Sequence, residues 1–285
     1  MMISKRSLMP YLPLAPLVIA YILLFNHTLA KLIKDWGTDD NYSHGYLIPF
    51  IAGYMIWQRR DEIKTIAVQP CNWGLAVVVL GMVMHLVGNI GAELFTMRMS
   101  LIVTVAGIVL FVFGWPIGKK IAVPLAYLIF MVPIPAILWN QVALPLQLFA
   151  AKLTANVIQA IGISVLREGN VLQLANTTLE VVDACSGLRS LTSLLALSGA
   201  LAYIVSLKTI SKWVLFLSAV PIAIAVNLIR LTATAIMARF IGAEVAQGFL
   251  HDMSGLIIFV AAFVLLYLAY ILIGRIEAFL THNRP

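Results

Sequence analysis

The sequence consists of long apolar runs that alternate with short polar or basic segments. The clearest run, residues 73–90, contains no Asp, Glu, Lys or Arg. A helix needs about 20 apolar residues to cross the hydrocarbon core of a bilayer. The chain is also 62% hydrophobic and only 11% charged, whereas soluble domains carry roughly 25% charged residues. The sequence therefore predicts an all-α polytopic membrane protein.

The apolar runs predict eight transmembrane helices. They cover approximately residues 11–32, 42–57, 73–90, 97–115, 121–138, 187–207, 213–240 and 253–273. The second run is short, but Trp57 followed by Arg59 and Arg60 is typical of an aromatic anchor and a positive stop. The first run lacks a small-residue cleavage site, so we expect it to be retained as a span. We expect a tight turn at residues 118–120.

Two segments do not fit a simple span. Residues 139–161 contain regularly interspersed polar side chains, which favours an amphipathic helix at the membrane interface or along a cleft. A ninth, polar span is the alternative. Residues 164–183 are rich in turn-forming residues, and residues 171–174 and 179–182 have strand character. This segment predicts a small β-hairpin that leads into Cys185.

The distribution of charge predicts the orientation of the chain. If the N-terminus is cytoplasmic, 11 of the 19 Lys and Arg residues and three of the 12 Asp and Glu residues lie on the cytoplasmic side. That side then carries +8 and the other −1, in agreement with the total of +7. Because Lys and Arg are enriched in cytoplasmic loops, we predict an N-in, C-in topology. Cys185, Arg230 and His251 then lie at the outer boundary of the membrane.

Cys185 is the candidate nucleophile. The other cysteine, Cys71, lies on the opposite side of the membrane in this topology, so the two cannot form a disulfide. An isolated cysteine is most often a small packing residue. A free thiol on the oxidising, exported side is nevertheless a liability unless it is used. Cys185 also stands at the start of a helix, whose dipole favours a thiolate. Asp183 and Ser186 are candidate supporting residues.

Asn227 and Arg230 are three residues apart, so they share one face of a helix. An arginine near the end of a span can simply extend to the interface. Close to Cys185, however, it would lower the thiol pKa from its free value of about 8.5. It could also hold the oxyanion of a tetrahedral intermediate. Arg189, one turn after Cys185, is the main rival for this role.

His251 is the candidate general acid and base. It opens the last predicted span, where the helix dipole disfavours imidazolium and keeps the ring available as a base. Asp252 is a candidate to orient it, and a loop histidine without a catalytic role is the alternative. Together the three residues indicate that Cys185 attacks a peptide carbonyl, Arg230 stabilises charge and His251 shuttles the proton. We expect a thioester intermediate.

Other chemistry is not indicated by the sequence. His27, His44 and His85 lack a second ligand three or four residues away, so we expect no metal site. No P-loop or dinucleotide fingerprint occurs, and we expect no cofactor. The basic residues form no continuous basic face, which argues against nucleic-acid binding. Residues 42–45 favour a helix start, with a role in a substrate path as the alternative.

Five segments of the sequence resemble the exosortase and archaeosortase family of membrane transpeptidases. Residues 42–49 (YSHGYLIP) and 57–60 (WQRR) are similar to the early segment of the family. Residues 183–188 (DACSGL), 227–230 (NLIR) and 251–255 (HDMSG) are similar to its cysteine, arginine and histidine motifs. The three motifs occur in the family's order, which makes the resemblance more specific than any one of them.

The resemblance implies a single integral membrane domain over residues 1–285, in the bacterial plasma (inner) membrane with its active site on the periplasmic face. The implied substrates are exported proteins that carry a C-terminal tail with a Pro-Glu-Pro type signal, an apolar span and a basic end. Cys185, Arg230 and His251 would cleave the tail and pass the protein to an acceptor nucleophile, lipid-linked or polysaccharide-linked. The family is associated with exopolysaccharide production and biofilm formation.

Two other classes of protein fit the composition. In a transporter or lipid-handling protein, Arg230 and His251 would line a permeation path. In a structural subunit of a polysaccharide export system, Cys185 would have no chemical role. Replacing Cys185 by Ser separates these hypotheses, because packing and transport tolerate the change and thiol chemistry does not.

Overall fold

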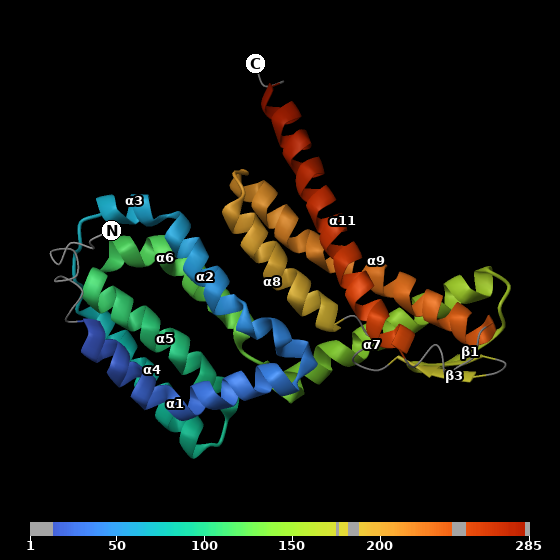
Figure 1. Ribbon diagram of the computed structural model, residues 1–285, viewed down its shortest axis with the longest axis horizontal. Helices are drawn as coiled ribbons and strands as arrows, with labels where there is room; N and C mark the ends of the chain where they lie inside the picture. The colour runs from blue at the N-terminus through green and yellow to red at the C-terminus, as the bar shows by residue number, and fades with distance from the viewer. Residues whose placement is uncertain (1–13, 175–176, 182–187, 241–248, 283–285) are drawn as a thin grey trace, which may run out of the picture. The chain divides into compact units, whose positions relative to one another are not determined.

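The computed structural model describes residues 14–174, 177–181, 188–240 and 249–282 (Figure 1). These residues form helices and one small antiparallel sheet, divided between two compact units. The first unit contains the described residues up to Asp39 together with Arg59–Val132. The second unit contains Asp40–Gln58 and the described residues from Pro133 onward.

The described elements of the first unit are all helices, joined by short loops and one isolated bridge between Gln69 and Gly114. Its elements are α1 (Leu14–Thr38), α3 (Arg60–Thr65), α4 (Trp73–Ile90), α5 (Leu94–Phe113), α6 (Trp115–Tyr127) and the 3₁₀ helix η4 (Leu128–Met131). α4 has the boundaries expected from its apolar run. α5 begins where Glu93 accepts hydrogen bonds from the backbone N–H groups of Phe95 at 2.9 Å and Thr96 at 2.6 Å. Such caps satisfy backbone donors that a helix start leaves unpaired.

Helices α4 and α5 pack closely along a row of buried glycines. Gly74, Gly81 and Gly88 recur every seven residues, so they lie on one face of α4. A methyl group at Gly88 would lie only 2.8 Å from Cγ and 2.9 Å from the backbone N of Met97. Small residues permit this close approach between membrane helices, where packing is a main source of helix association.

The turn between α5 and α6 lies at Gly114, so the predicted turn at residues 118–120 is wrong. Gly114 has φ of 84°, in the left-handed region that favours glycine. Trp115 begins α6, and a proline occupies its first turn, where a missing N–H does least harm. Residues 118–120 therefore continue the helix.

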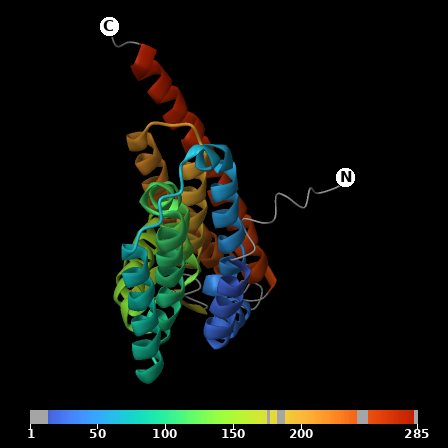
Figure 2. The same cartoon turned by 90° about the vertical axis from the view of Figure 1, so that its left-hand side faces the viewer.

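The second unit combines a helical bundle with the sheet. Its elements are the 3₁₀ helix η3 (Asp40–Tyr46), α2 (Ile48–Gln58), α7 (Ala136–Ala160), β1 (Val165–Glu168), β2 (Val171–Leu174), β3 (Thr177–Glu180), α8 (Leu188–Ile204), α9 (Thr209–Phe240) and α11 (Phe249–His282). α9 lies against α8 and α11 along one part of its length and against α7 and β3 along another (Figure 1). The C-terminal end of α11, in red, extends past the turn between α8 and α9 (Figure 2).

The predicted two-stranded hairpin is instead a three-stranded antiparallel sheet in the order β1-β2-β3. β1 and β2 are joined by a two-residue loop in which Gly169 has φ of 64°, as the favoured hairpin turns require. The extra strand, β1, was not predicted because its second half consists of the charged residues Arg167 and Glu168, which directly precede Gly169 and favour a turn in the sequence. β1 presents Val165 to the core and exposes its next three residues.

Within the described residues, five helices are long and apolar enough to cross a membrane. They are α1 from Ala15, α4, α5, α9 and residues Ile257–Thr281 of α11. Residues Trp115–Met131 and Ala136–Ala160 would add a sixth span if this broken pair of helices is counted as one. These helices make the chain a polytopic membrane protein, but the predicted number of eight spans is not confirmed.

Two of the predicted spans differ from the helices observed. The span expected at residues 42–57 is the 3₁₀ helix η3 followed by α2, whose 11 residues extend only about 16 Å. Pro49 suits the first turn of α2 and not the interior of a longer helix. The span expected at residues 121–138 is broken between η4 and α7, where Pro133 and Pro135 occur.

α7 corresponds to the segment for which we predicted an amphipathic helix. It has 25 residues and contains Pro145 in its interior. Its buried side chains are small or apolar, such as Ala151, Ala155 and Ile158. They face the sheet, and the remaining surface of α7 is largely exposed in the protein alone.

Candidate active site

Asn227 and Arg230 lie on the same face of α9, as their spacing predicts. Both are buried, with exposed fractions of 4% for Asn227 and 8% for Arg230. Burying a guanidinium is unfavourable unless the surrounding structure compensates its charge. A buried arginine on a membrane helix is therefore a stronger functional candidate than one that extends to the interface.

Arg230 lies where α9 passes from one hydrophobic core to another. Val226 belongs to the core shared by α8, α9 and α11, which we call the bundle core. Leu231, the residue after Arg230, belongs to the core formed by α7, α9 and the sheet, which we call the sheet core. The two cores thus hold the backbone on both sides of Arg230.

The end of β3 is fixed in the sheet core. Val181 is 1% exposed and belongs to the same core as Leu231. Its backbone N–H donates to the carbonyl of Asn170 at 2.9 Å, and Asn170 Nδ2 donates to the carbonyl of Val181 at 3.2 Å. Cys185 follows Val181 by four residues.

Three of the candidate residues lie outside the described residues: Cys185, Asp183 and Ser186. The side chains of His251 and Asp252 are not described either, although both residues lie in the first turn of α11. What the structure places are the elements on either side of them. These are the end of β3, the start of α8, the second half of α9 and the start of α11.

The helices of the second unit bring these elements to one end of the bundle. The backbone N–H of Lys208 donates to both carboxylate oxygens of Glu277, at 3.2 and 3.1 Å, so the turn between α8 and α9 lies beside the C-terminal part of α11. At a rise of about 1.5 Å per residue, the start of α8 lies roughly 24 Å from the turn along α8, and Arg230 lies roughly 32 Å from it along α9. The His251 backbone lies roughly 39 Å from Glu277 along α11. The starts of α8 and α11 and the second half of α9 lie toward the end opposite the turn (Figure 1).

Arg189, the rival of Arg230, is paired with an aspartate. Its Nη2 lies 2.9 Å from Oδ2 of Asp40, and its Nε donates to the backbone carbonyl of Asp40 at 3.0 Å. The two side chains are 40% and 80% exposed. Arg189 is thus engaged by η3 at the protein surface, whereas Arg230 is buried in α9.

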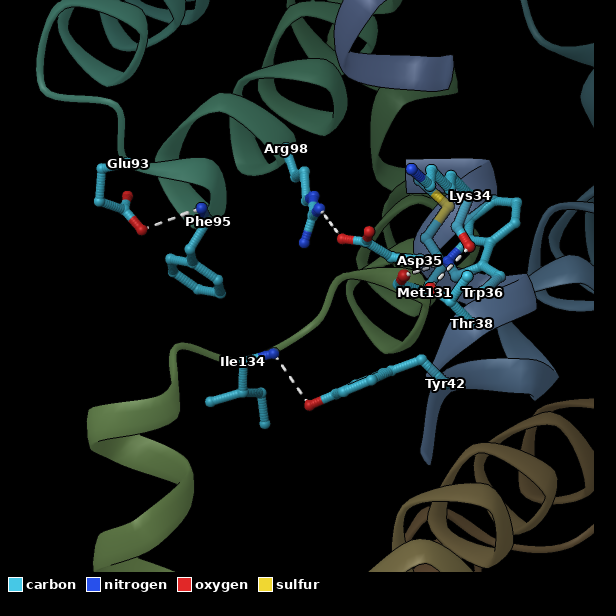
Figure 3. Close-up of polar contacts among 10 residues, drawn as sticks. All are labelled: Lys34, Asp35, Trp36, Thr38, Tyr42, Glu93, Phe95, Arg98, Met131 and Ile134. Carbon is cyan, nitrogen blue, oxygen red and sulfur yellow. Dashed lines mark hydrogen bonds and ion pairs between the residues drawn. The ribbon is translucent and has the colours of Figure 1, made fainter. Parts of the chain in front are cut away.

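Charged residues in the first unit were not singled out from the sequence. Arg98, at the start of α5, is buried and forms an ion pair with Asp35 near the end of α1 (Figure 3). The indole Nε1 of Trp36 donates to the carbonyl of Met131 at 2.8 Å. These contacts tie the end of α1 to α5 and to η4. A single arginine inside an apolar run is the sequence signal that could have identified Arg98.

The pKa of Glu93, the N-cap residue of α5, depends on the hydrogen bonds that its carboxylate accepts. Burial alone raises the pKa of the Glu93 carboxyl, but hydrogen bonds from Thr96 and Phe95 and the nearby charge of Arg98 outweigh it. The net result is a pKa below the usual range for glutamate. The cap therefore stays charged at neutral pH, when it accepts hydrogen bonds best.

η3 contributes residues that the sequence indicated only as a helix start or a substrate path. Nδ1 of His44 lies 3.2 Å from Oγ of Ser193 on α8. The hydroxyl of Tyr42 accepts a hydrogen bond from the backbone N–H of Ile134 at 3.0 Å (Figure 3). No sequence pattern pairs residues this far apart, so the contact of η3 with α8 could not be predicted.

Comparison with known protein families identifies the family of this chain. The family model described as transmembrane exosortase (Exosortase_EpsH) matches residues 36–268. The match includes the segments that carry Cys185, Arg230 and His251. No curated protein and no solved structure gives a significant match. Because the family model covers well over half of the chain, the protein belongs to the transmembrane exosortase family.

Proposed function

We propose that the protein is a membrane cysteine transpeptidase that cleaves the C-terminal sorting signal of exported proteins. Family membership supports a transpeptidase that acts on sorting signals. One observation supports the assignment of Cys185 and Arg230 to the same active site: the sheet core contains both Val181 and Leu231. These residues are the nearest described core neighbours of Cys185 and Arg230 along the chain.

The length of chain between these residues limits their separation. Four residues of extended chain reach about 14 Å at most, so Cys185 stays within that distance of Val181. Arg230 directly precedes Leu231, which shares the core with Val181. This supports a pairing of the Cys185 thiolate with the Arg230 guanidinium.

In the proposed first half-reaction, Cys185 forms an acyl-enzyme. His251 accepts the thiol proton as Sγ attacks the scissile carbonyl carbon, and the resulting oxyanion is held by the guanidinium of Arg230. When the intermediate collapses, the C–N bond breaks and His251 gives its proton to the leaving amine. The tail departs, and the exported protein is joined to Cys185 as a thioester.

In the second half-reaction, an acceptor nucleophile attacks the thioester carbonyl. His251 takes a proton from the nucleophile, the C–S bond breaks, and Cys185 is regenerated. Asp252 would orient His251, and Asp183, Ser186 and Asn227 would support the nucleophile and the arginine. Water as the acceptor would give hydrolysis, and a lipid-linked or polysaccharide-linked group would give transfer.

The substrates in this proposal are exported proteins with a Pro-Glu-Pro type signal, an apolar span and a basic end. The apolar span of such a tail would hold it in the plasma (inner) membrane, next to an enzyme in the same bilayer. The active site would lie on the periplasmic face, as the charge distribution predicts. Exopolysaccharide production and biofilm formation would be the processes served.

The experiment compares the mass of a secreted reporter with a Pro-Glu-Pro type tail after co-expression with the wild type, Cys185→Ala, Arg230→Ala or His251→Ala. Membrane levels are matched, and Arg239→Gln, an exposed position on the same helix, is the control. The reporter should lose its tail with the wild type and the control and keep it with the other three. Equal loss of the tail with Cys185→Ala would refute the assignment.

A further inference from the structure

η3 contacts α8 through two pairs of polar side chains. Asp40 pairs with Arg189 through both its carboxylate and its backbone carbonyl. His44 pairs with Ser193 through Nδ1 and Oγ at 3.2 Å. Within the described residues, these contacts join segments 149 positions apart in the sequence.

The two contacts lie on the same face of α8 and follow one another in the same order along η3. Arg189 and Ser193 are four residues apart, which places them on one face of α8, one above the other. Asp40 and His44 are also four apart, so both contacts have the same offset of 149 positions, although the 3₁₀ helix η3 does not place them on one face of its own. The pairing is therefore in register, and it covers the first one and a half turns of α8, which follow directly after the segment that carries Cys185.

η3 is itself held from its other side. Tyr42 is buried, its hydroxyl accepts the backbone N–H of Ile134, and its ring lies 6.0 Å from that of Trp139 in α7. The ring of His44 lies 6.2 Å from that of Tyr42. η3 is thus fixed between the start of α7 and the start of α8.

We propose that η3 is a clasp that positions the start of α8, with Asp40 and His44 as positioning residues for the cysteine of the proposed transpeptidase. The proposal rests on the function proposed above. It gives Arg189 a role that differs from that of Arg230. Arg189 acts through Asp40 to place the helix, and its cation is not what stabilises the thiolate.

Charge reversal separates these two roles of Arg189. Asp40→Arg and Arg189→Asp each place like charges opposite one another, whereas the double variant restores an opposite pair with its polarity exchanged. If Arg189 positions α8, the double variant recovers activity. If its cation acts directly on Cys185, the double variant stays as inactive as Arg189→Asp, because an aspartate then stands near the thiol.

The measurement is kcat and KM for cleavage of the Pro-Glu-Pro tail from the reporter in proteoliposomes. Each single reversal should lower kcat about tenfold with little change in KM, which corresponds to about 1.4 kcal/mol. The double variant should return to within about threefold of the wild type. Reversal of the exposed ion pair between Asp61 and Lys64 is the matched control and should leave kcat unchanged.

A second readout does not depend on the reaction. Hydrogen–deuterium exchange of the peptide that contains residues 189–193 should be faster in each single reversal and return to the wild-type rate in the double variant. If the reporter is never cleaved but this pattern appears, the clasp stands and the proposed function fails. Single reversals without effect on either readout, or a double variant without recovery, would overturn the clasp.

The contact of His44 with Ser193 gives an independent check. If both side chains act only through their mutual contact, His44→Ala combined with Ser193→Ala should lower kcat no further than either change alone. Fully additive losses would show that His44 acts on something other than α8 and would contradict its role as a positioning residue.

Discussion

At the scale of single residues, the ion pair of Asp35 with Arg98 is the clearest polar feature of the first unit. The Arg98 side chain is 4% exposed and that of Asp35 is 31% exposed. Removing one partner of a buried pair costs up to about 3–5 kcal/mol, because the other charge is left buried. The partial exposure of Asp35 reduces this figure, since water can reach the site.

Asp35→Asn is therefore expected to destabilise the protein by about 1–3 kcal/mol, below the range for a fully buried pair. The melting temperature of the detergent-solubilised protein measures the effect. Asp61→Asn is the control, because Asp61 is 75% exposed and its ion pairs lie at the surface. Equal melting temperatures for the two variants would show that the pair with Arg98 contributes little.

The sequence predicted part of the candidate site at this scale. The spacing of Asn227 and Arg230 predicted that they share a helix face, and the structure buries both on α9. The sequence could not predict that Asp40 forms an ion pair with Arg189, because that contact depends on the path of the chain between them. The roles of Cys185, Arg230 and His251 remain a proposal.

At the scale of elements, the packing of α4 against α5 depends on the absence of side chains. A Cβ at Gly81 would overlap the side chain of Thr104 and also lie 3.0 Å from its backbone N. The helices must move apart to accept a larger residue, and overpacking typically costs about 1–3 kcal/mol.

Gly81→Val should therefore lower the melting temperature clearly, whereas Gly53→Ala should not. Gly53 lies within α2, and a Cβ at this position would have no atom within 4 Å. Alanine is also the better helix former. Thermal unfolding in the same detergent compares the two variants. An unchanged melting temperature for Gly81→Val would mean that α4 and α5 are not closely packed.

The sequence located a helix correctly where its apolar run is not interrupted by proline. Residues 73–90 contain no Asp, Glu, Lys, Arg or proline, and the predicted boundaries match those of α4. Residues 42–57 and 121–138 also lack Asp, Glu, Lys and Arg, but prolines and 3₁₀ segments divide them. Hydropathy averages over such local breaks, which is why it predicted continuous spans there.

At the scale of the whole molecule, the charge distribution predicts an N-in, C-in topology that places Cys71 and Cys185 on opposite sides of the membrane. A membrane-impermeant maleimide added to intact cells should label the Cys71→Ser variant, through Cys185, and leave the Cys185→Ser variant unlabelled. Inverted membrane vesicles should give the reverse pattern, because they expose the cytoplasmic face.

The inverted vesicles also serve as the control for reactivity, since they show whether Cys71, which is partly exposed, can react at all. Labelling of the Cys185→Ser variant in intact cells would contradict the predicted topology. It would also place the proposed active site on the wrong side for an exported substrate.

The proposed reaction passes through a covalent bond between Cys185 and the exported protein. Purified protein incubated with the tailed reporter and quenched in acid can be measured by intact mass, with and without hydroxylamine, which cleaves thioesters. We predict an adduct with the mass of the reporter lacking its tail, released by hydroxylamine and absent from Cys185→Ala. A reporter that loses its tail while an equal adduct forms on Cys185→Ala, or while the adduct maps to another residue, would contradict the account.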